Sequence, residues 1–264
     1  MNKYFNLLMF ILIIIIYSCK TNGIHLIKVY YPSGKLKIEE QVLADSFVNG
    51  FYKEYYDNGT LYKDYNMVRG KLSGLCKVYD KIGKIYFAGN YKDSLEDGNQ
   101  VYYFDNGNID EKYFAKKGLT IGQKFKYYPD GKMRQYWFYD HQGRAKYQRV
   151  YDSIGNLISS SGNPIAEYLL FSRSFKDAII NKNDTLLINI FCATPPNAQV
   201  HLYFKELNGY LPQIDLSDSI VQNYATPSFI LNQIGNYKTK VVMSITNRDG
   251  TEEENYRVSA FTVK

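Results

Sequence analysis

Cysteine and tryptophan are scarce in this chain. Its 264 residues include three cysteines and one tryptophan. Cys76 and Cys192 lie far apart in the sequence, so they do not form the dense disulfide framework that stabilises small secreted domains. Each falls in an alternating or apolar run that is typical of a strand. We therefore expect two buried, inert thiols, with a bridge between domains as the alternative.

The residue patterns of common catalytic and metal sites are also missing. The three histidines, His25, His141 and His201, are scattered, and none has metal-ligand spacing to a cysteine or to another histidine. The sequence has no phosphate-binding loop, no Gly-x-Ser-x-Gly motif and no His-Glu-x-x-His motif. We therefore expect a protein that is not an enzyme and that holds neither a cofactor nor a metal ion.

The apolar run near the N-terminus is too short to span a membrane. It extends from Leu7 to Tyr17, whereas a transmembrane helix needs about 20 apolar residues. Lys3 precedes the run and supplies the positive charge with which secretory signals begin. The pattern predicts a signal peptide over residues 1–18.

The end of this run resembles a bacterial lipobox. Ile16-Tyr17-Ser18-Cys19 places a small residue before a cysteine, which implies cleavage before Cys19 and lipid attachment to it. Two or three acyl chains give the stable anchoring that one chain does not. Lys20 stands where a lipoprotein kept in the inner membrane often has Asp, so the resemblance implies the outer membrane, facing the periplasm or the cell surface. The alternative is an ordinary secretion signal with a chance cysteine.

Long runs of one charge are absent as well. The formal net charge is +6, and the excess of basic residues falls in the N-terminal part of the chain, where lysines alternate with acidic residues. Nucleic-acid binding is typical of a basic stripe or cluster, so this pattern disfavours nucleic acid as a partner. A weak attraction to anionic lipid or glycan stays open.

What the sequence does contain is a repeat with a fixed period. Five glycines recur at steps of 24 or 25 residues, and each has a tyrosine four residues before it. The glycines are Gly34, Gly59, Gly83, Gly107 and Gly131, and the tyrosines are Tyr30, Tyr55, Tyr79, Tyr103 and Tyr127. A second series with the same spacing is Gly50, Gly74, Gly98 and Gly122. Self-similarity at such a period indicates a repeat architecture.

Each unit reads as a β-hairpin. Asn58-Gly59 and Asp130-Gly131 lie between alternating runs, where glycine supplies the positive φ that a tight turn needs. In a three-residue loop, the residue two places after the glycine lies across from the tyrosine four places before it. These partners are Leu36, Leu61, Ile85, Ile109 and Met133. Cross-strand aromatic–aliphatic pairs of this kind stabilise a sheet.

The spacing halves near the end of the repeats. Gly131, Gly143 and Gly155 are 12 residues apart, and Tyr139 and Tyr151 keep their place four residues before a glycine. A half-period holds one strand and one turn, so the full period holds two strands. The array is expected to end near residue 158.

The units from Tyr30 to Leu36, Tyr55 to Leu61 and Tyr127 to Met133 resemble the MORN-repeat variants of bacterial proteins, including the YwqK family of antitoxins. The unit at Tyr79 departs from the pattern, with Asp80 and Ile82 in place of the second aromatic residue and the turn Asn. The resemblance implies an elongated, twisted antiparallel sheet over residues 28–158. It also implies an attachment or scaffold role, and no catalytic residues.

The aromatic residues form two series. We expect the tyrosines four residues before each glycine to hold the sheet together, because a single layer has no other core. A second series follows them directly and is expected on the opposite face, since side chains alternate along a strand. With Trp137, this series is the candidate binding face for a partner: Tyr31, Tyr56, Phe104, Tyr128 and Trp137.

The repeat of glycine and tyrosine does not continue into the C-terminal part of the chain. Residues 159–166 include a Ser-Ser-Ser-Gly-Asn-Pro run and are expected to form a linker. About seven short strands separated by turn residues follow, which favours a β-sandwich over residues 167–264. Gly235-Asn236-Tyr237 resembles the tyrosine corner of immunoglobulin-like (Ig-like) domains. The Cys–Trp–Cys core of antibody domains is absent.

Together these patterns predict an all-β protein. A signal peptide over residues 1–18 and a lipidated Cys19 with a linker to residue 27 precede an elongated β-meander of MORN-like repeats and an Ig-like sandwich. The expected function is a non-enzymatic, membrane-anchored lipoprotein that serves as a protein- or glycan-binding scaffold at the bacterial cell envelope. The alternative is an antitoxin or immunity protein with a cognate toxin as its partner.

Overall fold

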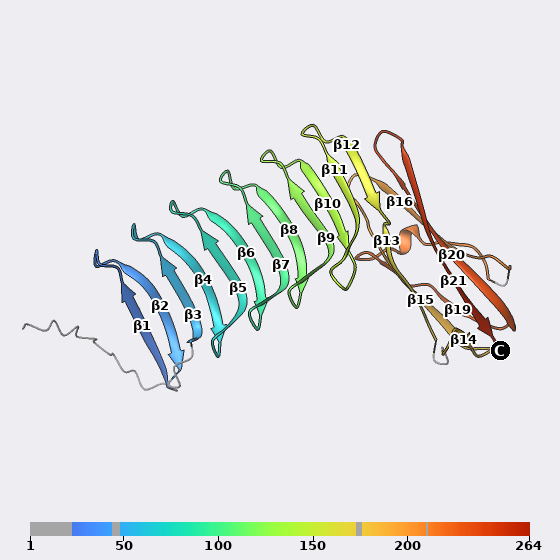
Figure 1. The fold of residues 1–264 in the computed structure, drawn as a ribbon, viewed down its shortest axis with the longest axis horizontal. Coiled ribbons are helices and arrows are strands. Elements are labelled where there is room, and N and C mark those ends of the chain that lie inside the picture. The colour runs from blue at the N-terminus through green and yellow to red at the C-terminus, as the bar shows by residue number, and fades with distance from the viewer. Residues whose placement is uncertain (1–22, 44–47, 173–175, 210) are drawn as a thin grey trace, which may run out of the picture.

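The computed structural model describes residues 23–43, 48–172, 176–209 and 211–264. In these residues the fold is all-β, as expected, and the one helix is a short 3₁₀ turn, η1, at Ser217–Ser219. A row of strands forms a long curved sheet, and a smaller β domain lies at its C-terminal end (Figure 1). No helix of the described residues is long and apolar enough to cross a membrane. The predicted signal peptide and Cys19 lie outside the described residues.

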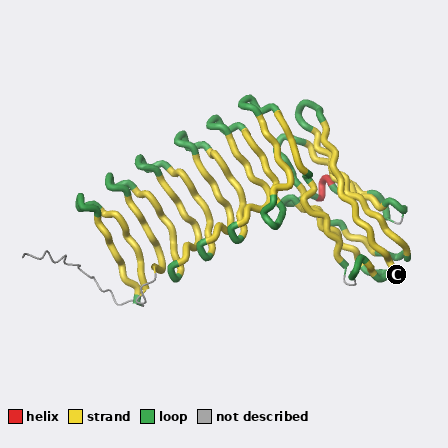
Figure 2. Tube along the Cα trace, in the orientation of Figure 1, coloured by secondary structure: helices red, strands yellow, loops and turns green. Residues whose placement is uncertain are grey.

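The long sheet is an antiparallel meander of twelve strands in sequence order. Its strands are β1 (Ile24–Tyr30), β2 (Leu36–Leu43), β3 (Val48–Tyr55), β4 (Leu61–Val68), β5 (Lys71–Tyr79), β6 (Ile85–Lys92), β7 (Leu95–Tyr103), β8 (Ile109–Lys116), β9 (Leu119–Tyr127), β10 (Met133–Tyr139), β11 (Ala145–Tyr151) and β12 (Leu157–Gly162). Turns line both long edges of this sheet (Figure 2). The half-spaced glycines Gly131, Gly143 and Gly155 lie in the three successive turns that connect β9 to β12, so one strand and one turn fill each half-period and the inference of two strands per period is confirmed.

The repeat glycines sit in three-residue loops at one edge. In the second loop, the Gly59 N–H donates to the Tyr56 carbonyl at 2.8 Å, and the Tyr56 N–H donates to the Thr60 carbonyl at 2.8 Å. Gly59 has a φ of +89°, a left-handed conformation that glycine adopts without the clash of a Cβ. The four other repeat glycines share this conformation, so the predicted turn chemistry is confirmed.

The predicted cross-strand pairs are also present in every unit. Tyr30 lies opposite Leu36, Tyr55 opposite Leu61, and the same pairing recurs at Tyr79, Tyr103 and Tyr127. Directly after each pair, one strand gains an extra residue and the register shifts. Such a bulge increases the local twist of the strand. The extra residues are Lys37, Tyr62, Tyr86, Asp110 and Arg134.

The second glycine series lies toward the other end of the strands, away from the turns of the first series, where the pairing of neighbouring strands shifts register. Gly98 falls between Glu96 and Gln100, a stretch in which β6 and β7 shift their pairing. Its φ is +124°, and a Cβ built on it would lie 2.8 Å from the Cβ of Asn90. Glycine here permits a close approach of two strands, which is consistent with the bend that the strands show (Figure 1).

The C-terminal domain consists of two sheets around one core. The first sheet contains β13 (Ile165–Phe171), β15 (Thr185–Cys192), β18 (Tyr224–Ala225) and β19 (Ser228–Ile230). The second sheet has the strand order β14 (Ile179–Ile180), β21 (Glu252–Val263), β20 (Gly235–Thr246), β16 (Gln199–Glu206) and β17 (Ile214–Asp215). Ile188 from the first sheet and Leu202 from the second are fully buried in one cluster. The Phe204 and Phe229 rings lie 4.8 Å apart and join the two sheets.

Tyr237 opens the long strand β20, as the sequence indicates. Its hydroxyl donates to the Gln233 carbonyl at 2.9 Å, four residues upstream. The ring is buried and stacks on Phe261 with centroids 5.0 Å apart. This hydrogen bond has the geometry expected of a tyrosine corner.

The expected linker over residues 159–166 is wrong. Strand β12 continues to Gly162 and β13 begins at Ile165, which leaves two residues between them. Ser159, Ser160 and Ser161 pair with β11, so their backbone groups belong to the sheet ladder. The composition suggested a linker because serine is common in loops, but an edge strand accepts serine equally well. The sheet also begins earlier than residue 28, at Ile24.

The small domain packs against one face of the sheet at its C-terminal end. The Phe138 and Phe191 rings lie 4.7 Å apart. The Arg149 guanidinium, with 1 % of its side chain exposed, forms an ion pair with Glu253 at 2.7 Å. The Tyr147 hydroxyl also donates to Glu253, at 2.7 Å. A buried charge that is paired and hydrogen-bonded fixes the orientation of the groups around it.

Candidate functional site

The two faces of the sheet differ in what covers them. Cross-strand register places Phe138 opposite Tyr147, and Tyr136 opposite Arg149, on the face that the C-terminal domain contacts. The same register places Trp137 opposite Lys124 and Gln148, on the other face. None of the domain contacts described above falls on this other face, which we call the open face. Any partner of the sheet therefore has one long surface available.

The tyrosines four residues before each glycine act as predicted in the sheet. They end their strands opposite the aliphatic partner, and Tyr55, Tyr79, Tyr103 and Tyr127 are half-buried. Tyr127 stacks on Phe125, with centroids 6.4 Å apart, on the face that the C-terminal domain contacts. Tyr30 is 55 % exposed because β1 is the first strand of the sheet. This series serves the cohesion of the array.

The expected location of the second aromatic series is wrong. Tyr31, Tyr56, Phe104 and Tyr128 do not lie on a strand face; each is the first residue of a turn. Alternation along a strand does not extend into the turn, so it does not predict their direction. The hydroxyl of Tyr56 donates to the Tyr79 carbonyl of the next unit at 3.0 Å. Tyr31 and Tyr128 make the same bond to the Tyr55 and Tyr151 carbonyls, at 2.7 and 3.0 Å.

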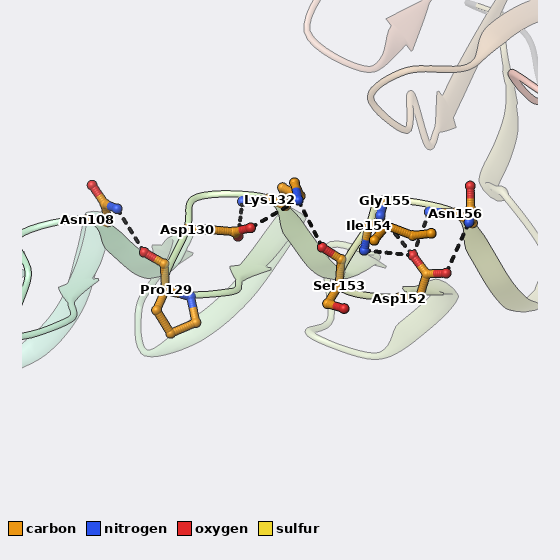
Figure 3. Close-up of polar contacts among 9 residues, drawn as sticks. All are labelled: Asn108, Pro129, Asp130, Lys132, Asp152, Ser153, Ile154, Gly155 and Asn156. Atoms are coloured by element: carbon orange, nitrogen blue, oxygen red, sulfur yellow. Dashed lines mark hydrogen bonds and ion pairs between the residues drawn. The ribbon is translucent and has the colours of Figure 1, made fainter.

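Further side chains continue this connection along the row of turns, part of which is drawn in Figure 3. The Asn108 amide donates to the Pro129 carbonyl at 2.8 Å, and the Lys132 ammonium donates to the Ser153 carbonyl at 3.1 Å. Asn58 and Lys84 reach the next turn in the same way. We call this row of bonds the turn ladder. It gives the turn aromatics a structural role and reduces their value as a free binding surface.

Trp137 is the one member of the predicted binding face that lies on the open face. It is half-buried on β10, and the Lys124 ammonium lies 5.8 Å from its ring. The same ammonium lies 4.8 Å from the Tyr113 ring and forms an ion pair with Glu111 at 2.8 Å. Cation–π contacts of this kind hold a lysine above aromatic rings. Trp137 is therefore part of an aromatic and charged surface, separate from the other four residues.

The spacing of the repeats did not predict the aromatic residues that build this surface. Register places them on the open face in the middle of successive strands. Tyr52 and Tyr65 stack with centroids 4.7 Å apart, and Phe87 lies 4.7 Å from Tyr102. A signal for them exists in the sequence: residues two places apart on a strand share a face, so Tyr65 lies on the same face as Lys63. We call the set the open-face aromatics: Tyr52, Tyr65, Phe87, Tyr91, Tyr102, Tyr113 and Trp137.

Four of the open-face aromatics, together with Tyr86, line a shallow hollow. It has a volume of about 410 Å³ and is lined by Tyr65, Cys76, Phe87, Tyr91 and Tyr102, with Lys63 and several aliphatic side chains. Burial raises the pKa of Tyr91 to about 12, so its hydroxyl stays protonated at neutral pH. The hollow therefore offers ring faces and neutral hydroxyl groups, which suit stacking and hydrogen bonding.

The two cysteines of the described residues are free and buried, as predicted. Burial raises the pKa of the Cys192 thiol to about 12 and also raises that of Cys76. A thiol with a raised pKa holds little thiolate at neutral pH and is a poor nucleophile. In the described part of the chain, no group of three or more His, Cys, Asp or Glu side chains could hold a metal ion.

Charge on the open face is balanced by pairs across neighbouring strands. Lys63 and Glu54 lie 3.3 Å apart, and Glu111 accepts both Lys124 and, at 3.9 Å, Lys126. Partly exposed pairs of this kind contribute little to stability, about 0–1 kcal/mol each. They leave a surface of mixed sign around the aromatic rings, which fits a polar but largely uncharged partner.

Comparison with known proteins identifies the first hairpin. Residues 26–42 match the model of the MORN repeat variant family. No curated protein matches the chain. The match and the strand-rich structure support a MORN-repeat protein. The matched hairpin comprises most of β1 and β2, and the later MORN-like hairpins repeat its loop and its Tyr–aliphatic pair.

Proposed function

We propose that the chain is a non-enzymatic repeat scaffold that binds a protein or a glycan through the open face of its twelve-stranded sheet. The observation that carries this proposal is the hollow of about 410 Å³ lined by open-face aromatics. The C-terminal domain contacts the other face of the sheet near β9 to β11, whereas the hollow lies on the open face at β4 to β7 and is not covered by that domain. The tyrosines of the turns are engaged in the turn ladder and are not needed for binding.

The chemistry of the open-face aromatics supports this role. Tyrosine offers a large, rigid contact surface with two side-chain torsions, so little conformational entropy is lost on binding. Its ring face stacks on flat apolar groups, and its hydroxyl bonds to polar ones. A sugar ring and a peptide segment both present such groups. The balanced ion pairs around the rings disfavour a strongly charged partner.

We also propose that the scaffold is attached to a membrane through Cys19. This residue lies outside the described residues, so the proposal rests on the lipobox resemblance and on where the sheet begins. The residues between Cys19 and Ile24 can reach at most about 3.5 Å each. A lipid on Cys19 would therefore hold the first strand close to the membrane, with the rest of the array extending from it. Cys19→Ala is expected to move the protein from the membrane fraction to the soluble fraction, and unchanged partitioning would contradict the anchor.

We infer that the C-terminal domain is Ig-like. Strands β13, β15 and β19 correspond to A, B and E of that fold, and β21, β20 and β16 correspond to G, F and C. The hydrogen bond from Tyr237 to Gln233 supports the same reading. In this role the domain would act as a spacer or as an adhesive unit at the end of the array.

The alternative role, an antitoxin with a cognate toxin, rests on the resemblance to the YwqK family. It predicts a tight complex with a toxin encoded nearby. A gene neighbourhood without a toxin would argue against this role and would leave the scaffold proposal intact.

The scaffold proposal can be tested with the soluble chain, without its signal peptide and lipid. We expect a glycan array and an envelope protein fraction to yield at least one ligand that the wild-type chain retains. The double variant Tyr65→Ala with Tyr102→Ala should lose that ligand, because both rings line the hollow. Phe114→Ala is the matched control: Phe114 is 41 % exposed and pairs with Asn99 on the opposite face. Loss of binding in the control, but not in the double variant, would contradict the proposal.

A further inference from the structure

A second pocket lies where the array meets the C-terminal domain. It has a volume of about 490 Å³, which is within the usual size range of small-molecule sites. Gln123 of β9 supplies one wall, and the loop after β15, the start of β16 and the segment from η1 to β18 supply the rest. Pockets between domains are a frequent place for ligands, because two rigid surfaces meet there.

The lining of this pocket holds amides and hydroxyls but no ionisable side chain. Its polar members are Gln123, Thr194, Ser217, Gln222 and Asn223, and its apolar members are Pro195, Ala198, Val200 and Ile220. A charged ligand in such a site would lose its hydration without gaining an opposite charge. The pocket is therefore suited to a neutral ligand.

An interdomain network makes part of the lining rigid. The Gln123 amide donates to the Thr194 hydroxyl oxygen at 3.0 Å and to the Asn223 side-chain oxygen at 2.9 Å. The Asn223 amide donates to the same Thr194 oxygen at 2.8 Å and to the Cys192 carbonyl at 2.9 Å. Groups held by such a network are already placed before a ligand arrives, which reduces the entropy lost on binding.

The same network fixes which hydrogen-bonding groups can serve a ligand. The Thr194 oxygen already accepts two N–H groups, so its hydroxyl hydrogen is a donor for another partner. Gln123 uses its amide nitrogen for protein contacts and retains its side-chain oxygen as an acceptor. The exposed Gln222 amide adds one donor group and one acceptor. Donors and acceptors therefore lie side by side in the pocket. This arrangement matches a ligand whose groups each donate and accept hydrogen bonds, as hydroxyl groups do.

The backbone beside these groups adopts a conformation that is unusual for residues with side chains. Gln222 and Asn223 have φ values of +48° and +72°, in the left-handed region. Both are the central residues of a two-residue turn closed by two hydrogen bonds between Val221 and Tyr224, where a positive φ at both positions is the usual geometry. The tight turn between Val221 and Tyr224 holds both amides at the edge of the pocket.

We propose that this junction pocket binds a neutral saccharide unit. The pocket lies away from the open face, so the inference goes beyond the proposed scaffold role and does not depend on it. The sugar hydroxyls would bond to Thr194, Gln123 and Gln222, and the carbon skeleton would contact the apolar part of the lining, such as Pro195 and Ile220. A free sugar and the end of a glycan share this chemistry.

The test is a titration of the soluble chain, followed by NMR of the side-chain amides. The probes are glucose, galactose, N-acetylglucosamine and maltose, with glucuronate and glucosamine as charged counterparts. We expect at least one neutral sugar to shift the resonances of Gln123 and Gln222, and its charged counterpart to bind about tenfold more weakly. Comparing maltose with glucose separates a glycan segment from a single free sugar.

Gln222→Gly provides the decisive variant. Glycine adopts a positive φ without strain, so the unfolding temperature should not fall, whereas the sugar affinity should fall about tenfold with the lost amide. The double variant Tyr65→Ala with Tyr102→Ala should leave sugar binding unchanged, which separates this pocket from the open face. The proposal would be overturned if no neutral sugar shifts these resonances, or if Gln222→Gly binds the sugar as well as the wild type.

Discussion

Single side chains connect each turn of the array to the next. In the turn ladder, Tyr31, Tyr56 and Tyr128 donate their hydroxyls to a carbonyl of the following unit. Phe104 occupies the same position without a hydroxyl, and Asn106 and Asn108 bond to Pro129 instead. Because a repeat unit makes its sheet contacts with the units beside it, each such bond contributes directly to the coupling between units.

The ladder predicts opposite effects for two substitutions at equivalent positions. Tyr128→Phe removes the bond to the Tyr151 carbonyl and should lower the unfolding free energy by about 1 kcal/mol. Phe104→Tyr should raise it by a similar amount, because its hydroxyl would lie within reach of the Tyr127 carbonyl. Chemical denaturation of both variants measures the two changes. Equal losses in both would show that the hydroxyl is not the contributing group.

Asp152 makes one turn sensitive to acid. Its carboxylate accepts the N–H groups of Ile154, Gly155 and Asn156 at 2.8–3.0 Å, as Figure 3 shows. These bonds, first that from the Asn156 backbone, hold the pKa of Asp152 below 3.8. A carboxyl whose pKa is lowered by folding stabilises the fold above its unfolded pKa, and this contribution is lost as pH falls through the folded pKa.

We therefore expect an NMR titration to give Asp152 a pKa below that of an unfolded aspartate. Asp152→Asn should be less stable than the wild type near neutral pH, and the difference should shrink once the wild-type carboxyl is protonated. A titration midpoint at or above the unfolded value would contradict the geometry of this turn.

At the scale of the hairpin, the two glycine series have different structural roles. The first closes the turns, where a Cβ would meet nothing within 4 Å at Gly107. The second lies in the middle of strands, where Gly98 allows close contact with Asn90. The two positions share a positive φ, so the comparison separates backbone strain from crowding.

This difference predicts unequal costs for the same substitution. Gly107→Ala should destabilise the array by about 1–2 kcal/mol, the cost of a left-handed alanine. Gly98→Ala should cost more, because its Cβ would also lie 2.8 Å from the Asn90 Cβ and would push the strands apart. Thermal or chemical unfolding of the two variants gives the comparison. Equal costs would mean that the bend does not depend on close packing at Gly98.

The hairpin is also the scale at which the sequence is most informative. Glycine spacing and turn chemistry predicted the loop at Gly59 and the pair of Tyr55 with Leu61, because both are local. The face of Tyr56 could not be predicted by alternation, since a turn residue follows the geometry of its loop. The bulge at Tyr62 shifts the register after each pair and hides the open-face aromatics from a simple period of two.

At the scale of the whole molecule, the junction between the array and the C-terminal domain decides which face is free. Arg149 and Glu253 are separated by 104 residues in sequence and form an ion pair in the structure. No local pattern connects them, so the sequence predicted neither the junction nor its pocket. The buried guanidinium also bonds to the Tyr147 hydroxyl at 2.6 Å, which couples β11 to the last strand.

Removing this arginine should weaken the junction. Arg149→Met keeps much of the volume but leaves the Glu253 carboxylate without its opposite charge, bonded only to the Tyr147 hydroxyl among the described residues, at an expected cost of about 3 kcal/mol or more. The double variant with Glu253→Gln should recover part of the loss, because it removes the unpaired charge. Denaturation followed by separate probes in the array and the domain measures this. An Arg149→Met variant as stable as the wild type would show that the contact does not hold the two parts together.

The central claim is that the open face is the binding surface of the scaffold. Its most direct test is to measure, by titration calorimetry, the affinity for the first ligand that the wild-type chain captures. The measurement compares the wild type, the double variant Tyr65→Ala with Tyr102→Ala, and Phe114→Ala, once their folded stabilities have been shown to match. The account predicts that Tyr65→Ala with Tyr102→Ala lowers the affinity about tenfold or more, since central aromatic residues dominate interface energies. Phe114→Ala should bind like the wild type. Equal affinity in the double variant and the wild type would contradict the claim and place the binding surface elsewhere on the molecule.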